Sequence, residues 1–357
     1  MTMTMRLRTR TPRQRGMGLV EVMVSVIIAM LLVLVIYQIY EVSEGQKRTI
    51  TAGSDAQQNA AYGLYVLGHD LAMAGNGIAS SADTMKACPF DAGAPEQSLA
   101  PIPVLIIPGA TDNDPDSVAI FYGGSSTLST PVQFKTTATT GSPYVVPAPV
   151  GFSPNDVVVA VQNASCTLST VDAGGVSVDG ASGFTTLTHT PLVGDIGATY
   201  TAVNASLVNL GPAAGVGRVL YTVDPATRAL RTQKTLPTID TVNPVIADVV
   251  NLKLYYGLDV NGDGVVDTWQ GATGAWAPAA LAALAPAQRL AAMRQLLAVR
   301  VAIVTRSGQY EKDPVTTAPL SIFDGAVTMA VSADDQHYRY KVLESTVPLR
   351  NAVWNTQ

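Results

Sequence analysis

The chain has 357 residues, of which 47% are hydrophobic and 14% charged, and its net charge is -5. This composition is too apolar for a disordered chain, and its acidic balance excludes a protein that binds DNA or RNA through a basic face. Five arginines are the only charged residues before Gly16, and without them the net charge becomes -10. We therefore expect residues 1–16 to form a basic leader ahead of an acidic body.

Residues 17–40 form an apolar segment with one charge, Glu21. As a helix these residues would extend about 36 Å at about 1.5 Å per residue, enough to cross a bilayer core of about 30 Å. Because positive charge stays on the cytoplasmic side, the chain after Tyr40 is expected on the other side of the membrane.

Two simpler interpretations of this segment explain less. A secretory signal peptide has an apolar run of about 7–15 residues followed by a small-residue cleavage site. Here the run is longer, and it continues as Tyr37-Gln38-Ile39-Tyr40 without such a site. An ordinary signal anchor would explain the arginines and the length but not Glu21, because a carboxylate at the start of a membrane helix is costly and usually functional.

The stretch Arg15-Gly16-Met17-Gly18-Leu19-Val20-Glu21 resembles the type III signal of type IV pilins and pseudopilins. The resemblance implies that a prepilin peptidase cuts between Gly16 and Met17 and methylates the new amine of Met17. It also implies that Glu21 meets the N-terminal amine of a neighbouring subunit in the fibre, where the two buried charges compensate each other. Met17 replaces the usual phenylalanine and Gly18 the usual Ser or Thr, but Gly16 and Glu21 are in place.

Residues 41–76 are expected to continue the helix as its amphipathic, periplasmic half. Small and apolar side chains recur at steps of three and four residues, which is the spacing of one helical face: Ala60, Ala61, Leu64, Leu67, Leu71 and Ala74. The pattern predicts a helix from about residue 17 to about residue 74. We expect it to be interrupted or kinked near Gly45 and Gly53 and to stop at Gly75-Asn76-Gly77.

Residues 77–357 are expected to form a β-rich head of antiparallel strands, because short β-type runs alternate with turn residues. The runs are 104–107, 117–122, 157–161 and 218–222, and core strands are expected at 249–256, 297–304 and 338–347. The Ala-rich stretch 278–296 predicts one or two short helices, broken at Pro286. With the pilin resemblance, the fold class is α+β: a long N-terminal helix packed on an antiparallel sheet.

The C-terminal part resembles the PilW-type minor pilins. The resemblance rests on residues 298–307, 338–342 and 346–351, and on residues 67–77 near the helix end. It implies a minor pilin that helps to initiate type IV pilus assembly and is located at or near the tip. Other minor pilins and the major pilin would be its partners, and the family allows a tip adhesin as well. The protein would sit in the inner membrane before assembly and on the pilus surface afterwards.

Two alternatives stay open. A minor pseudopilin of a type II secretion system shares the leader, Glu21 and the helix, although the Leu349-Arg350-Asn351 ending and the large head favour the pilus. A membrane-anchored calcium-binding surface protein that never polymerises would need neither cleavage after Gly16 nor Glu21.

Residues 259–267 resemble the calcium loops of several extracellular bacterial proteins. Oxygen donors at alternating positions suit Ca2+: Asp259, Asn261, Asp263, the Val265 carbonyl and Asp267. Gln270 stands where an EF-hand has a bidentate Glu, so the expected affinity is weak, about 10⁻⁴–10⁻³ M. A polar Asn-Gly/Asp-Gly turn would use the same residues.

Cys88 and Cys166 are the only cysteines, and in an exported protein we expect them to form a disulfide. The alternative is a pair of separate buried thiols. No other metal-binding or catalytic motif is present, so the sequence predicts no enzyme. The acidic stretch 112–116 is expected to be a solvated turn, and Trp269, Trp276 and Trp354 are expected to pack in the core or at sheet edges.

Overall fold

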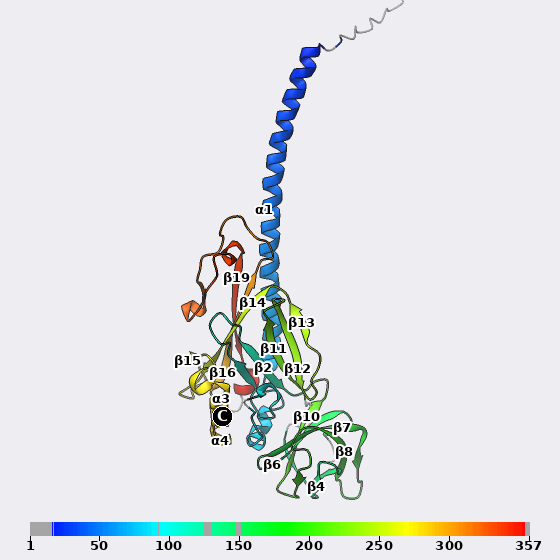
Figure 1. The fold of residues 1–357 in the computed structure, drawn as a ribbon. Helices are drawn as coiled ribbons and strands as arrows, with labels where there is room; N and C mark the ends of the chain where they lie inside the picture. Colours follow the sequence, from blue (N-terminus) through cyan, green and yellow to red (C-terminus); the bar gives the residue numbers. More distant parts are fainter. Residues whose placement is uncertain (1–15, 17, 92, 125–129, 148–150, 354–357) are drawn as a thin grey trace, which may run out of the picture. The chain divides into compact units, whose positions relative to one another are not determined.

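The computed structural model describes residues 16, 18–91, 93–124, 130–147 and 151–353. The chain divides into two compact units, one that ends at Ala52 and one that begins at Gly53. The first unit consists of the first part of helix α1 (Leu19–Met73). The second unit contains the last turns of α1 and the whole β-rich head (Figure 1).

Helix α1 is 55 residues long, close to the extent predicted from the sequence. Its helical structure runs without a break through Gly45 and Gly53, so the expected interruption is wrong. A glycine inside a helix lowers the stability of the helix by only about 1 kcal/mol relative to alanine. The glycine still makes its backbone hydrogen bonds, so the helix can continue through it. Two isolated glycines are therefore too weak a signal to end a helix of this length.

The helix stops where the sequence predicted. Gly75 and Gly77 adopt φ angles of 80° and 66°, in the left-handed region that favours glycine. The Gly75 N–H then donates to the carbonyl of Phe121 at 2.9 Å, and the Asn76 carbonyl accepts from Gly123 N–H at 2.7 Å. The end of the helix is thus tied directly to the sheet beside it.

The described strands form three larger antiparallel sheets and two small ones. Sheet 1 has the order β1 (Val104–Ile107), β2 (Ser117–Tyr122), β11 (Gly217–Asp224), β12 (Ala229–Leu236), β13 (Asn243–Ile246). Sheet 2 has the order β3 (Val132–Gln133), β10 (Ser206–Pro212), β6 (Asp156–Gln162), β7 (Ser165–Val178), β8 (Thr185–Gly194), β5 (Tyr144–Val146). Sheet 3 has the order β15 (Thr268–Gln270), β14 (Val249–Leu258), β16 (Leu296–Arg306), β19 (Tyr340–Pro348). All seven predicted runs are strands.

The remaining elements are short. Two-stranded ladders join β4 (Ala138–Thr139) to β9 (Thr199–Tyr200) and β17 (Leu320–Ile322) to β18 (Val327–Met329). The short helices are α2 (Ala82–Met85), α3 (Pro278–Ala283), α4 (Pro286–Arg294) and α5 (Arg350–Val353). Single 3₁₀ turns occupy 79–81, 95–97, 274–276, 323–325 and 335–337. The Ala-rich stretch forms two helices as predicted, and Pro286 begins the second one, because a proline needs no N–H in the first turn.

The main core lies between the last turns of α1 and sheets 1 and 3. The buried face of the helix carries small or branched residues, Ala60, Leu67 and Leu71, which pack in one cluster with side chains of both sheets. At Gly63 an added Cβ would lie 2.5 Å from the Cδ1 of Ile246 and 3.1 Å from that of Ile303. The glycine therefore lets the helix backbone approach both sheets, and the predicted α+β arrangement of helix on antiparallel sheet is confirmed.

Sheet 2 is an insertion in sheet 1. Strands β2 and β11 are neighbours, with Tyr122 paired to Gly217, yet all six strands of sheet 2 lie between them in the sequence. Sheet 2 has a core of its own around the rings of Phe134, Tyr144 and Tyr200. In Figure 1 its strands form a group beside the other two sheets. The sequence predicted strands here but not this topology.

Candidate assembly site

The predicted processing site lies at the very start of the described chain. Gly16 is exposed, and Met17 lies outside the described residues. Glu21 occupies the first turn of α1, where its N–H donates to the Gly18 carbonyl at 2.9 Å. A carboxylate is favourable at this end of a helix because the unpaired N–H groups give it a partial positive charge.

The first part of α1 exposes apolar side chains on every face. The exposed fraction is 77% for Leu19, 59% for Leu31 and 72% for Tyr37, and no residue of the most apolar window is buried. In the described chain this is the one helix that is long and apolar enough to cross a membrane, judged by length and composition. A helix that is apolar all round requires lipid or other helices around it.

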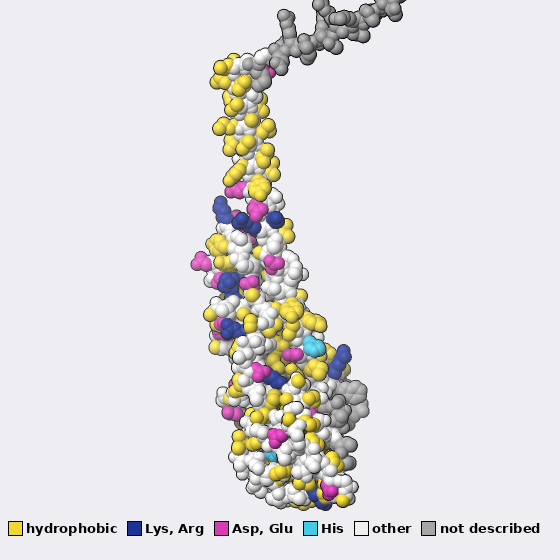
Figure 2. All heavy atoms as spheres, turned by 90° about the vertical axis from the view of Figure 1, so that its right-hand side faces the viewer, with side chains coloured by type: hydrophobic (Ala, Val, Ile, Leu, Met, Phe, Trp, Pro, Cys, Tyr) yellow, Lys and Arg dark blue, Asp and Glu magenta, His cyan; other side chains and the backbone are white. Residues whose placement is uncertain are grey.

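The end of the apolar segment is marked by a change in side-chain type. Tyr37 and Tyr40 are both largely exposed, at 72% and 70%. Directly after them come the charged residues Glu41, Glu44 and Arg48, and the Arg48 Nε lies 3.3 Å from the Glu44 Oε1. Tyrosines followed by charges are typical of a membrane–water interface. Figure 2 shows the same change, from hydrophobic side chains to interspersed charges along the helix.

Residues of β11, β16 and α5 hold the last turns of α1 by specific hydrogen bonds. The Tyr221 hydroxyl donates to Asp70 Oδ2 at 2.7 Å, and the Thr305 Oγ1 donates to the Ala56 carbonyl at 2.9 Å. Burial, and then the charge of Asp70, raise the pKa of Tyr221, so the hydroxyl keeps the proton that it donates. Asn351 Nδ2 donates to the Ala72 carbonyl at 3.3 Å. These bonds fix the docking of the helix in addition to its apolar face.

Cys88 and Cys166 form a disulfide, as predicted. Both residues are fully buried, and the Cα atoms lie 5.5 Å apart. Cys88 follows α2, whereas Cys166 lies on β7, so the bond ties sheet 2 to the segment that follows the N-terminal helix. The alternative of two unpaired thiols is excluded.

In the predicted calcium loop the carboxylates bind the backbone of the loop itself. Asp259 accepts from the N–H groups of Gly262, Asp263 and Gly264 at 2.6–3.2 Å. Asp267 accepts from the backbone N–H groups of Val260 and Asn261 at 2.8 and 3.2 Å. Asp263 accepts from the Val265 N–H at 2.8 Å.

Among the described residues, no three His, Cys, Asp or Glu side chains come together in an arrangement that could hold a metal. The three carboxylates of this loop are therefore not gathered around one point. The loop has the geometry of a polar turn closed by its own hydrogen bonds, and calcium binding stays a prediction.

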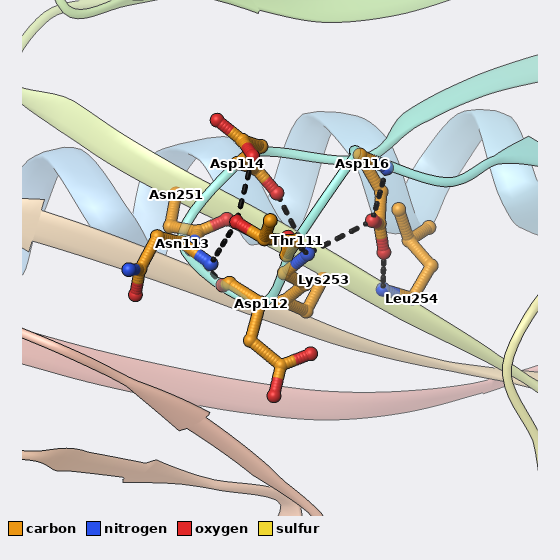
Figure 3. A network of polar contacts seen from close by, with 9 residues as sticks. Thr111, Asp112, Asn113, Asp114, Asp116, Asn251, Lys253 and Leu254 are labelled. Atoms are coloured by element: carbon orange, nitrogen blue, oxygen red, sulfur yellow. Dashed lines mark hydrogen bonds and ion pairs between the residues drawn. The ribbon is translucent and has the colours of Figure 1, made fainter.

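The acidic stretch 112–116 is not simply a solvated turn, and for Asp116 that prediction is wrong. Asp116 is only 5% exposed, and its Oδ1 lies 3.0 Å from Lys253 Nζ, which is 4% exposed as a residue. The ammonium also donates to the carbonyls of Thr111 and Asp114, at 3.2 and 2.7 Å. Figure 3 shows the loop curled around the ammonium, with the Asp112 side chain turned away from it. A buried charge has to be paired, so Lys253 holds the loop on sheet 3.

A sequence signal for this pair exists. Lys253 and Asn251 alternate with the core residues Leu252 and Leu254 in β14, so both occupy the second face of a buried strand. A lysine at such a position requires a carboxylate or carbonyl partner, which the sequence does not identify.

Two of the three tryptophans that were predicted to pack in the core or at sheet edges lie within the described residues. Trp276 packs in the core against Tyr256, with ring centroids 5.0 Å apart, as predicted. Trp269 lies on β15, the edge strand of sheet 3, also as predicted; it is partly exposed and lines a cleft. Trp354 lies outside the described residues.

Two family models match the chain at opposite ends. Residues 11–37 match the prokaryotic N-terminal methylation motif, and residues 219–351 match the type IV pilus-assembly protein W family. No curated protein sequence matches the chain. A type IV-like pilin from Thermus thermophilus is 11% identical over 58% of this chain and 88% of its own, with a TM-score of 0.25. A TM-score this low does not support any conclusion about the fold of the head.

A methylation motif at the start of a long apolar helix, followed by an antiparallel β-sheet head, defines a type IV pilin-like protein. The second match supports the PilW type of pilin: it covers residues 219–351, which begin in β11 and include all of sheet 3. The match contains the C-terminal segments on which the sequence resemblance rested, but not residues 67–77. The family is one of structural subunits.

Proposed function

We propose that the chain is a minor pilin that helps to initiate type IV pilus assembly and is located at or near the pilus tip. The observation that carries the proposal is the first part of α1, which is exposed and apolar on every face apart from Glu21. Such a helix can lie in the inner membrane and can equally join a bundle of similar helices. The PilW-type match and the large head support a subunit used in few copies.

The proposed route begins with cleavage between Gly16 and Met17 by a prepilin peptidase and methylation of Met17. The head would then face the periplasm, with the membrane boundary near Tyr40. On assembly, Glu21 would pair with the N-terminal amine of another minor pilin or of the major pilin. In an apolar bundle either charge alone is strongly destabilising, so the pair would set the register between subunits. A tip adhesin is a further candidate partner.

The test is Glu21→Ala in cells that make pili, with Glu44→Ala as the matched control on the same helix beyond the apolar segment. We expect unchanged amounts of the Glu21→Ala protein in the membrane, because removing a charge does not hinder insertion. Its amount in sheared pili should fall on the order of 100-fold, since the amine is left unpaired. The Glu44→Ala protein should enter pili normally.

Mass spectrometry of the N-terminal peptide completes the test. A mature chain that begins with N-methylated Met17 is expected when the cells contain their own prepilin peptidase. An uncut leader, or normal recovery of Glu21→Ala in pili, would overturn the proposal.

We also propose that residues 259–267 bind Ca2+ weakly, and that the ion stiffens this exposed loop. The support is the alternation of oxygen donors in the sequence. In the described geometry Asp259, Asp263 and Asp267 are occupied by backbone N–H groups, so binding would require part of these hydrogen bonds to be exchanged for the ion.

A further inference from the structure

A cleft of about 330 Å3 opens on sheet 3, on the face opposite the core that contacts α1. Its walls come from the loop at residues 108–112, from β14 around Tyr255, and from residues 269–273 at the end of β15. The volume falls at the lower end of the range of about 300–1,000 Å3 typical of small-molecule sites. The cleft is far along the chain from Glu21 and has no part in the proposed assembly function.

The floor of the cleft is rigid, and its charges balance. Lys253 donates to three oxygens, and the partner Asp116 also accepts from the N–H groups of Gly109 and Leu254, at 2.9 and 3.1 Å. Every N–H of the ammonium is thereby used within the chain (Figure 3). The floor is polar and pre-organised, but it offers no free charge to a ligand.

Two aromatic rings lie on the strands above this floor, and each one is seated against a glycine. Trp269 pairs with Gly257 across the β14–β15 ladder, and an added Cβ on that glycine would lie 2.7 Å from the indole Cζ3. A Cβ on Gly271 would lie 3.3 Å from Cε1 of Tyr255. The sequence therefore places Tyr-x-Gly on one strand opposite Trp-x-Gly on the next, and no side chain at either glycine could fit without moving a ring.

Both rings remain partly exposed in the wall of the cleft, although each has one side covered. Tyr255 also packs against Phe323, with ring centroids 5.0 Å apart. Exposed, fixed rings side by side on one sheet face form an apolar platform. A flat apolar ligand surface can stack on such a platform with little loss of side-chain entropy, because the rings are already held in place.

Polar groups that can form further hydrogen bonds lie beside the two rings in the wall of the cleft. Within the described residues, no hydrogen bond engages the Asp112 carboxylate or the Tyr255 hydroxyl, and Figure 3 shows the carboxylate directed away from the Lys253 network. Burial, and then the charges of Asp112 and Asp116, raise the pKa of Tyr255. The hydroxyl is therefore a neutral donor at physiological pH, while Asp112 is an acceptor that forms strong, charge-assisted bonds. The Gln270 amide in the same wall has both kinds of group.

We propose that this cleft binds a neutral saccharide. A sugar ring has an apolar face of C–H groups that can stack on Trp269 or Tyr255, and hydroxyls at its edge that can donate to Asp112 and accept from Tyr255 and Gln270. An organic cation would use the rings and the carboxylate but not the donors.

The test uses the full chain in nanodiscs of phosphatidylethanolamine and phosphatidylglycerol, since many detergents carry sugar head groups that would compete. The probes are the methyl glycosides of glucose, galactose, mannose and N-acetylglucosamine, followed by saturation-transfer NMR and tryptophan fluorescence. We expect at least one probe to bind with a Kd on the order of 1 mM. Trp269→Ala should weaken that binding about tenfold, and Asp112→Asn should weaken it several-fold.

Controls separate the cleft from the rest of the protein. Asp313→Asn and Tyr65→Ala alter an exposed carboxylate and an exposed ring elsewhere and should bind the sugar normally. Glu21→Ala should also bind normally, so failure of the assembly proposal would leave this one intact. Asp112 lies in an exposed loop, so Asp112→Asn tests the site even if Trp269→Ala disturbs the fold.

Three results would overturn the proposal. One is the absence of saturation transfer to all four probes. Another is sugar binding that both Asp112→Asn and Trp269→Ala leave unchanged. The third is binding of tetramethylammonium in place of the glycosides, which would assign the cleft to an organic cation.

Discussion

Two parts of the head acquire a stable fold by different means. Sheets 1 and 3 pack against one face of the last turns of α1, and their core residues form one cluster with Ala60, Leu67 and Leu71. Sheet 2 does not share that cluster. It has a small aromatic core of its own, and a second cluster joins it to Phe121 and Leu236 of sheet 1 and to the segment that carries Cys88. The family match at 219–351 covers most of the first part and none of the second. The helix-binding part is therefore the one with the recognisable pattern, whereas the inserted sheet has a core of its own and a covalent bond to the segment after α1.

The largest expected effect concerns the helix-binding part. Lys253→Met removes the partner of Asp116 and leaves a buried carboxylate unpaired, so the free energy of unfolding should fall by about 3–5 kcal/mol. Denaturant unfolding of the full chain, followed by tryptophan fluorescence, measures the loss.

A double variant serves as the control for this prediction. Adding Asp116→Leu to Lys253→Met should recover most of the loss, because a buried ion pair can be replaced by apolar side chains of similar size. Lys312→Met, at an exposed lysine in the loop after β16, should change stability by less than about 0.5 kcal/mol. If the single and double variants were equally unstable, the pair would not be what holds the loop.

The Lys253 site also shows the limit of sequence reasoning. Long periodic segments were predictable, because the apolar spacing of α1 and the alternation in β14 and β16 are local properties of the chain. The partner of Lys253 is 137 residues away, and nothing local indicates which of the acidic residues at 112–116 is buried. The insertion of sheet 2 between β2 and β11 could not be predicted either, because strand pairing depends on contacts between residues that are far apart in the sequence.

A smaller effect is expected from the bond that anchors sheet 2. The double substitution Cys88→Ser and Cys166→Ser removes a cross-link across 78 residues and should lower stability by about 2–4 kcal/mol. Amide hydrogen exchange should accelerate in β6, β7 and the segment around Cys88, while β14 and β16 stay protected. Mild reduction of the unmodified protein should produce the same pattern. Equal acceleration throughout sheet 3 would show that the two parts of the head are not separately stabilised.

The smallest effect is expected at residues 259–267. Calorimetry should detect Ca2+ binding with a Kd of about 10⁻⁴–10⁻³ M, and Asp263→Ala should abolish it. A chelator should then increase protease cleavage in this loop without a measurable change in the unfolding midpoint. Asp313→Asn provides the control for a general loss of surface charge. No heat of binding, together with unchanged protease sensitivity, would show that the loop is a polar turn only.

The candidate sites differ in how far the sequence could define them. Gly16, Met17 and Glu21 form one short contiguous motif, so local sequence is enough to predict the assembly site. The disulfide followed from cell compartment and cysteine number. The cleft could not be found in this way, because Asp112, Tyr255 and Trp269 come from three separate segments. The sequence does contain the aromatic-x-Gly spacing twice, at residues 255–257 and 269–271. This repeat indicates a site only once β14 and β15 are known to pair.

The position of sheet 2 also bears on the order in which the head folds. Pairing β2 with β11 requires closure of a loop of about 95 residues, and the entropy lost grows with the logarithm of that length. Once sheet 2 has formed, its two ends are already together, because its first strand in the sequence, β3, pairs with its last, β10. The loop is then short, and the pairing of Tyr122 with Gly217 becomes nearly a local event. A chain that becomes available in sequence order would thus complete the insertion first, and sheet 1 would pack on α1 only when β11 arrives.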